Sequence, residues 1–371
     1  TGKDFSAYMP LCKERKTERY SWQRHYTEIW DFRKDNIFST SNGVKTSVVE
    51  NAPKPISRSA PYPNYSDVLL HSFCSKGVLK LNENKPIRRN LFSGTMTDYW
   101  VRFDPAKNPY NPHEWIQKHD QLKQLGEQKL PVTLEENAYV IFDFKRIETG
   151  FFKTYADVLD DSEIIIAYSE TSTCDEFSFS NMNVHNVIQY NVKKGDELDV
   201  ISFEPYTVKF AIVAIKKGCI KLNTFGVKTY EYDTSSVTLP QCNDEVINAV
   251  CRGGLRTYAH NAVDIYTDCP SRERAGWLCD SYFTAKTEYT ISSKTSVEND
   301  FLENYVLFNN EGEYPDGMIP MCFPSDIEES GKFIPQWSMW FILEVEEYVN
   351  VRKGKFPKEF FKEKRNKNKS H

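Results

Sequence analysis

The sequence lacks long apolar runs, an excess of basic charge, and an initiator methionine or signal peptide at its first residues. No window of about 18 consecutive apolar residues occurs in the 371-residue chain, so we expect no membrane insertion. The net charge of −5 is the opposite of the basic excess that nucleic-acid-binding domains usually carry, so we expect no nucleic-acid partner. The chain opens TGKDFSAYMP, without a methionine or the apolar core of a signal peptide.

This opening leaves the compartment undecided. Either a signal peptide has been removed or the sequence is a fragment. We expect a periplasmic or extracellular protein if a signal peptide precedes Thr1, and a cytoplasmic protein otherwise.

The cysteines also lack the spacings that indicate a metal site. There are nine, with no C-x-x-C pair and no paired Cys/His spacing, so we predict neither a zinc site nor a disulfide framework. Free and mostly buried thiols are the interpretation that we favour, with no metal and no cofactor. The nine are Cys12, Cys74, Cys174, Cys219, Cys242, Cys251, Cys269, Cys279 and Cys322.

What the chain does contain is enough for two or three ordinary domains. Hydrophobic residues make up 40% and charged residues 27%, which is typical of globular proteins and excludes wholesale disorder. Aromatic residues make up 14%, including 21 Tyr and 24 Phe. Flat rings with a polar group suit stacking on sugars, but they also serve the cores of all-β domains.

The pattern along the chain predicts β structure first and helices afterwards. Residues 1–130 are rich in proline and long connections, which favours an irregular β-rich region with insertions. Residues 131–240 hold short runs with period two, such as NAYVIFDFK, where Val140, Phe142 and Phe144 share one face. Turns such as KKGD and KKGC separate these runs, and together they predict an antiparallel β-sandwich.

From residue 241 to 371 the period becomes helical. NDEVINAVCRGGLRTYAHNA begins with a capping Asn243 and carries Ile247, Val250, Gly254 and Tyr258 at helical spacing. SYFTAKTEY, ENDFLENYVLF and PQWSMWFILEVEEYV continue the helical pattern. The last twenty residues are strongly basic, and we favour a solvated tail there over a nucleic-acid patch.

The densest group of charged residues is TDCPSRERAGWLCD, residues 267–280, and two interpretations fit it. In the first, a helix starts here: Asp268 is its N-cap, Pro270 lies near the first helical position and Glu273 lies in the first turn. Alternatively, Asp268, Arg272, Glu273 and Asp280 lie on a segment that leaves a loop and enters a helix, where several polar groups converge on one pocket. A cluster of carboxylates raises the pKa of a neighbouring glutamic acid, as a glycosidase's proton donor requires.

The stretch DCPSRERAGWLCD closely resembles the signature D-C-P-x-R-[DE]-x-x-G-W-x-x-D of bacterial α-L-rhamnosidases of glycoside hydrolase family 78. YVIFDFKRIETGFFK, IIIAYSE and ISFEPYTVKFAIVAIKKG resemble the β-sandwich that precedes the catalytic domain in that family. IPQWSMWFILEVEEY is similar to an early helix of its barrel. The resemblance covers roughly residues 135–350 and implies an antiparallel β-sandwich region followed by the first helices of an (α/α)6 barrel, the six-hairpin catalytic domain.

The resemblance also implies a function and a set of site residues. The function is inverting hydrolysis of terminal α-L-rhamnosides, with a rhamnose-containing glycan or glycoside as partner. By position, Glu273 is the general acid, and Asp268, Arg272 and Asp280 hold the sugar hydroxyls. Trp337 and Trp340 either wall the sugar subsite or belong to the barrel core. Cys279 departs from the family, because glycine is frequent at that position.

A second departure concerns the general base, a carboxylate that an inverting enzyme places roughly 6.5–9.5 Å from the acid. In the family this base comes late in the barrel, and twelve helices of about 11–14 residues plus connections need more chain than residues 241–371 supply. We therefore expect a partial chain whose base is missing and whose turnover alone is negligible. Glu311, Glu313, Asp316 and Glu344 are available, but solvated turn acids and a helix-surface charge are the favoured interpretation.

Two other functions stay open. One is a non-catalytic carbohydrate-binding protein in which the β-sandwich does the binding. The other is a related exo-glycosidase that acts on another sugar, because the motif specifies the barrel and the acid more firmly than the sugar. The oligomeric state is not predicted.

Overall fold

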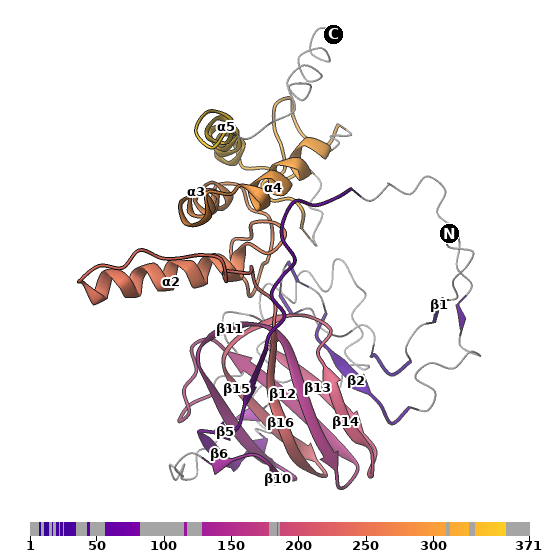
Figure 1. Cartoon of the computed structure of the whole chain (residues 1–371). Coiled ribbons are helices and arrows are strands. Elements are labelled where there is room, and N and C mark those ends of the chain that lie inside the picture. Colours follow the sequence, from indigo (N-terminus) through magenta and orange to yellow (C-terminus); the bar gives the residue numbers. More distant parts are fainter. Residues whose placement is uncertain are drawn as a thin grey trace. The chain divides into compact units, whose positions relative to one another are not determined.

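The computed structural model describes residues 7–8, 11–14, 17, 20–21, 23–24, 26–34, 43–44, 56–81, 115–116, 128–177, 184, 186–308, 312–325 and 331–353. The chain divides into two units (Figure 1). The sheet unit comprises Thr1–Ile56 and Ser66–Thr229, and the helical unit comprises Ser57–Tyr65 and Tyr230–His371. The three-part division at residues 130 and 240 stays a prediction, and the basic segment 354–371 lies outside the described residues.

The described strands follow one another from the start of the chain to residue 229, as predicted. They are β1 (Ala7–Tyr8), β2 (Ile29–Asp31), β3 (Gly43–Val44), β4 (Asp67–Leu70), β5 (Ser72–Phe73), β6 (Ser75–Val78), β7 (Lys80–Leu81), β8 (Trp115–Ile116), β9 (Gln128–Lys129), β10 (Val132–Glu135), β11 (Ala138–Val158), β12 (Ser162–Ser169), β13 (Val187–Val192), β14 (Glu197–Ile201), β15 (Tyr206–Lys217) and β16 (Cys219–Thr229).

Ten of these strands form one sheet in the order β10-β16-β11-β15-β12-β13-β2, with β14 and β6 also paired to β11 and β4 to β16. All of its pairs are antiparallel except β13 with β2. The long strand β11 joins two parts of this sheet, because its first half pairs with β6 and β15 and its second half with β14 and β16. The register between β11 and β15 shifts between Asp143 and Glu148.

The period of two in the sequence becomes the core of the sheet unit. Val140, Phe142 and Phe144 lie in one buried cluster, in which the ring of Phe142 stacks on that of Phe225 at 4.6 Å between centroids. The predicted turns are also present: Gly195 and Gly218 adopt φ of 85° and 87°, which glycine does at little cost. Burying such alternating apolar side chains is the main favourable contribution to folding.

One disulfide corrects the cysteine prediction. Cys74, between β5 and β6, is bonded to Cys174, in the segment that follows β12. The other seven are free thiols, as predicted, but most of them are not buried: only Cys12 and Cys322 are, while four are half-buried and Cys242 is exposed. No periodic pattern in the sequence marks this pair, because the two residues are 100 positions apart and meet only through the sheet topology.

The helical unit contains four described helices, all at predicted positions: α2 (Glu245–Asn261), α3 (Asp280–Ser292), α4 (Ser296–Leu307) and α5 (Pro335–Asn350). Their shared core is aromatic, and Phe301 and Tyr305 of α4 pack against each other and against Tyr266 and Phe341. None of the described helices combines the length and apolarity needed to cross a membrane.

Helix α2 differs in two details from the prediction. The N-cap is Asp244 rather than Asn243, and its carboxylate accepts hydrogen bonds from the backbone N–H groups of Val246 and Ile247. Of the positions at helical spacing, Tyr258 is buried, whereas Ile247 and Val250 are 53% and 69% exposed. Helical spacing identifies a stripe of side chains, but it does not say which part of the stripe a neighbour covers.

An extended segment, Ser57–Tyr65, belongs to the helical unit although it precedes most of the sheet in sequence. The fully buried carboxylate of Asp300 on α4 accepts hydrogen bonds from the N–H groups of Ser59 and Ala60, the latter at 2.7 Å. The Arg58 guanidinium lies 3.5 Å from the same carboxylate. We call residues 57–65 the strap.

Candidate functional site

The charged motif forms a loop that closes on itself before α3 begins. The Asp268 N–H donates to the carbonyl of Ala275, and the Ala275 N–H donates to Oδ1 of Asp268, both at 3.3 Å. No helix starts at Asp268; α3 begins at Asp280. The interpretation of Asp268 and Pro270 as a helix start is therefore wrong, because the Asp268 carboxylate caps a loop rather than a first helical turn.

A neighbouring segment holds this loop in place. The Gly276 carbonyl accepts hydrogen bonds from the Phe323 N–H and from the buried hydroxyl of Tyr305, both at 2.9 Å, and the Gly276 N–H donates to Pro324. A Cβ at Gly276 would lie 2.4 Å from the Phe323 carbonyl oxygen. The glycine of the motif is thus explained by the close approach of two backbones.

The loop and the first residue of α3 bring the four predicted charged side chains within electrostatic reach of one another. Nε of Arg272 lies 3.1 Å from Oε1 of Glu273. The charge of Glu273 acts in turn on the carboxyls of Asp268 and Asp280. Arg272 and Asp280 are exposed and Glu273 is partly exposed, so the group is open to solvent on one side.

Burial changes the acidity of this group. It raises the pKa of Asp268 to about 7, and the negative charge of Glu273 adds to the effect. Burial of the carboxyl also raises the pKa of Asp280, again with a contribution from Glu273, although the residue as a whole is exposed. The pKa of the neighbouring Cys269 thiol rises to about 12 through burial and the Asp268 charge. The raised pKa at Asp268 thus belongs to a residue that the resemblance assigns to the sugar hydroxyls.

This arrangement has a defined chemical capacity. Carboxyls that interact this closely titrate as a group, so the cluster can hold a proton near neutral pH, as a proton donor requires. The free carboxylate oxygens and the guanidinium can bind hydroxyl groups through charge-assisted hydrogen bonds. Within the described part of the chain, no three His, Cys, Asp or Glu side chains are grouped as metal ligands.

The two predicted tryptophans lie on α5 in aromatic surroundings. Trp337 packs against the core of the helical unit, and its indole Nε1 is buried without a hydrogen-bond partner among the described residues. The ring of Trp340 packs on those of Tyr282 and Phe283, at 4.9 and 5.4 Å between centroids. A sugar contact by either tryptophan stays a prediction.

The four acids considered for the general base have different places. Glu313 and Asp316 are exposed, and Glu311 lies outside the described residues. Glu344 is fully buried, and Oε2 of its carboxyl accepts a hydrogen bond from the Ser281 hydroxyl at 2.6 Å. The expectation of a helix-surface charge is therefore wrong for Glu344.

Sequence reasoning also missed residues that surround the motif. The Arg274 guanidinium lies 4.9 Å from the centre of the Tyr230 ring, and Arg274 adopts a φ of 48°. Other residues around the motif carry no sequence pattern that marks them as part of the site, or lie far from it in the chain: Tyr230, Tyr305, Ser281 and Glu344. Only Gly276, as part of the motif, carried a signal.

Comparison with known proteins identifies one matching family. Residues 235–356 match the family described as the bacterial alpha-L-rhamnosidase six-hairpin glycosidase domain. No curated protein sequence matches the chain.

Two solved structures share the fold. The GH78 family rhamnosidase of Bacillus sp. GL1 aligns with a TM-score of 0.66 at 12% identity, over 91% of this chain and 53% of that one. A rhamnosidase from Klebsiella oxytoca, solved with rhamnose bound, aligns with a TM-score of 0.54 at 12% identity, over 78% of this chain and 53% of that one. The chain thus spans about half the length of these enzymes, and the predicted order of a β-sandwich region followed by barrel helices is confirmed. The chain therefore has the fold of the corresponding part of these two rhamnosidases, and residues 235–356 are similar to the bacterial alpha-L-rhamnosidase six-hairpin glycosidase domain.

Proposed function

We propose that this chain is the sandwich region and the acid-bearing part of an inverting α-L-rhamnosidase-like glycoside hydrolase. The observation that carries the proposal is the cluster on the loop before α3. There the carboxyl of Glu273 is 3.1 Å from Arg272, and burial and the charge of Glu273 raise the pKa of Asp268 to about 7. The match of residues 235–356 to a rhamnosidase domain and the rhamnose in the Klebsiella oxytoca structure support rhamnose as the sugar.

In this proposal Glu273 delivers the proton to the departing glycosidic oxygen. Asp268, whose carboxyl interacts with the charge of Glu273, shares a proton with it and accepts a hydrogen bond from a sugar hydroxyl. Arg272 and Asp280 bind further sugar hydroxyls. The general base is not assigned, because the buried Glu344 is bonded to Ser281 and has no open side toward a water molecule.

Binding of free L-rhamnose, measured by isothermal titration calorimetry, tests the sugar site without requiring turnover. We expect the chain to bind L-rhamnose, and Arg272→Ala and Asp280→Ala each to weaken binding at least about tenfold, since hydrogen bonds to charged groups contribute roughly 1.5–3 kcal/mol. Glu346→Ala, which removes an exposed acid on α5, serves as the matched control and leaves the affinity unchanged. No binding by the unaltered chain, or equal binding by all variants, contradicts the proposal. Binding that survives in both site variants would favour the carbohydrate-binding alternative.

Glu273→Gln tests the acid separately. In a chain extended by the remaining barrel helices, we expect this substitution to lower hydrolysis of an aryl α-L-rhamnoside by about 10²–10⁴-fold, the usual contribution of a positioned proton donor. The affinity for L-rhamnose stays within a few-fold, because the amide keeps the shape of the side chain. Unchanged turnover would remove Glu273 from this role.

The disulfide supports one of the two compartments. Disulfides persist in oxidising environments such as the periplasm and the cell exterior, and they are rare in the cytosol. We therefore propose a periplasmic or extracellular location. Titration of free thiols in protein isolated under acid-quenched conditions tests this, since Cys74 and Cys174 should be resistant to alkylation until a reductant is added.

A further inference from the structure

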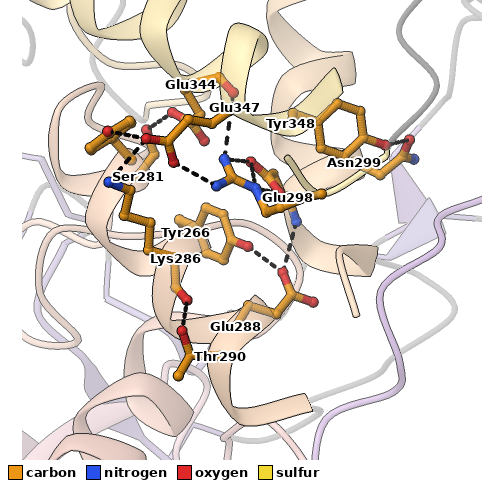
Figure 2. A network of polar contacts seen from close by, with 12 residues as sticks. Tyr266, Ser281, Lys286, Glu288, Thr290, Glu298, Asn299, Glu344, Glu347 and Tyr348 are labelled. Atoms are coloured by element: carbon orange, nitrogen blue, oxygen red, sulfur yellow. Dashed lines mark hydrogen bonds and ion pairs between the residues drawn. The ribbon is translucent and has the colours of Figure 1, made fainter. Parts of the chain in front are cut away.

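Glu344 is a fully buried acid to which the proposed chemistry assigns no role. It lies on α5 within a network of carboxylates drawn from three helices (Figure 2). Its Oε2 accepts the Ser281 hydroxyl at 2.6 Å, and its Oε1 has no hydrogen-bond partner among the described residues. Burying a carboxyl oxygen without a hydrogen-bond partner costs free energy of folding. The structural role of Glu344 therefore depends on the hydrogen bond that it makes to Ser281.

That bond ends at the first turn of α3. Ser281 is fully buried and directly follows Asp280, one of the proposed sugar ligands. The N-cap of α3, Cys279, makes no capping hydrogen bond, so the first turn depends on contacts with other elements. The backbone N–H of Ser281 donates to the carbonyl of Trp277 at 3.2 Å. The Ser281–Glu344 bond is the fully buried side-chain link between this turn and α5. The turn also contacts α5 through the Tyr282 hydroxyl, which donates to Glu347, and through the rings of Tyr282 and Phe283, which pack on Trp340.

The groups around Glu344 are mainly acidic, and the cation among them is engaged elsewhere. Arg352 donates to the carboxylate of Glu298 on α4 at 2.8 Å and to that of Glu347 on α5 at 2.9 Å. It reaches Glu344 only at the backbone carbonyl, at 3.5 Å. On α3, Glu288 accepts hydrogen bonds from Tyr266 and from the first N–H groups of α4. The other charged or titratable groups that act on Glu344 or that Glu344 acts on are Glu298, Glu347, Arg352 and Tyr305.

These surroundings determine the charge that Glu344 carries. Burial raises its pKa to about 8; the Ser281 bond opposes the shift, and the negative charge of Glu298 adds to it. Around neutral pH the side chain is accordingly a neutral acid, which suits a buried hydrogen-bonding role and not that of a base.

We propose that Glu344 is a positioning residue that holds, through Ser281, the first turn of α3 and with it Asp280 in the sugar site. The inference deepens the proposed function and rests on it, since Asp280 matters here as a sugar ligand. Neither Ser281 nor Glu344 contacts the sugar in this proposal; both act through the position of the helix start.

Hydrogen exchange of the full chain, followed by mass spectrometry, tests the positioning without any ligand. We expect Ser281→Ala and Glu344→Met to speed exchange of the amides in residues 280–284 by about tenfold, the effect of losing one hydrogen bond. Tyr348→Phe, on the same helix as Glu344, is the control. It removes the hydrogen bond from the Tyr348 hydroxyl to Asn299 of α4 and leaves the groups at the start of α3 unchanged. If residues 280–284 exchange equally in Ser281→Ala and in the unaltered chain, or if Tyr348→Phe has the same effect, the proposal is wrong.

Titration with L-rhamnose then links positioning to binding. Ser281→Ala and Glu344→Met should weaken affinity about tenfold, while Tyr348→Phe leaves it unchanged. Glu344→Gln keeps an acceptor for Ser281 and should retain affinity. Binding by the unaltered chain should weaken as the pH rises through about 8, where Glu344 gains a buried charge, and this loss should be absent in the Gln variant.

The outcomes separate the two proposals. If the unaltered chain does not bind L-rhamnose but exchange behaves as expected, the proposed function fails while Glu344 still holds the helix start. If the chain binds L-rhamnose and Ser281→Ala and Glu344→Met bind it equally well, the positioning of Asp280 by Glu344 is overturned and the proposed function stands.

Discussion

Cys279 shows how a single side chain departs from the motif at a structural cost. Its backbone has φ 66° and ψ −58°, in the left-handed half of the map, where a non-glycine residue costs of order 1–3 kcal/mol. Glycine, which the family signature often has at this position, adopts such angles at little cost. The strained residue lies immediately before Asp280, so α3 begins next to a backbone conformation that a non-glycine residue disfavours.

We expect Cys279→Gly to stabilise the helical unit by about 1 kcal/mol, because relief of the strain outweighs the greater chain entropy of glycine. Chemical denaturation of the full chain measures the change. Cys279→Ala keeps a Cβ and should show no such gain; a gain of equal size in both variants would argue against backbone strain.

The raised carboxyl pKa values predict how stability depends on pH. Asp268 and Glu344 have folded-state pKa values of about 7 and 8, above their ordinary values of 3.8 and 4.5, so the folded protein binds these protons more tightly than the unfolded chain. Their contribution is fully present below about pH 4 and is lost as the pH rises to about 8. We expect the free energy of unfolding of the helical unit to fall over that range by roughly 1 kcal/mol per pH unit for each group.

Denaturation measured from pH 5 to 9 tests this dependence. Glu344→Gln should flatten the part of the slope nearest pH 8, since the amide does not titrate. A stability that rises with pH, or a slope unchanged by the substitution, would contradict the assignment.

Among the elements, α4 and the strap illustrate how a helix depends on a distant segment. The Asp300 carboxylate satisfies the Ser59 and Ala60 N–H groups and the Ser59 hydroxyl. Local sequence around residue 300 predicts the helix but not this partner, which lies about 240 positions earlier.

We expect Asp300→Ala to destabilise the helical unit by about 3 kcal/mol, because it leaves buried backbone donors unpaired. Hydrogen exchange in peptides covering residues 57–65 and 296–307 measures the loss. Arg58→Ala, which removes a partly exposed ion pair with the same carboxylate, should cost about 1 kcal/mol or less. Undiminished protection of the strap in Asp300→Ala would show that other contacts hold it.

The helices also show the limits of periodicity. All four described helices in the second half were predicted from apolar spacing, yet Ile247 and Val250 of α2 face solvent and Glu344 of α5 is buried. A helical period identifies which residues share a face. Which face is covered depends on neighbours that the local pattern does not contain.

At the scale of the whole molecule, the disulfide is expected to contribute to the stability of the sheet unit. Cys74 and Cys174 close a loop with a sequence separation of 100, and a cross-link over about 100 residues removes roughly 4.7 kcal/mol of chain entropy from the unfolded state in the simplest treatment. Since both cysteines lie in the sheet unit, reduction should act on that unit.

Thermal unfolding with and without reductant tests this expectation. Reduction should lower the stability of the sheet unit by about 2–5 kcal/mol, and a Cys74→Ser/Cys174→Ser double variant should no longer respond to reductant. Cys242→Ser, which removes an exposed free thiol, serves as the control and should respond like the unaltered chain. A response in the double variant equal to that of the unaltered chain would rule out this bond as its cause.

Much of the architecture and the location of the candidate site followed from the residues alone. Alternation in residues 137–229, helical spacing after residue 243 and the motif from Asp268 to Asp280 are local patterns, and local patterns follow from the geometry of strands, helices and loops. The tertiary structure decided the Cys74–Cys174 pairing, the raised pKa of Asp268 and the burial of Glu344 against Ser281. Each of these depends on desolvation or on contacts between residues far apart in the chain, and such contacts exist only once the chain has folded.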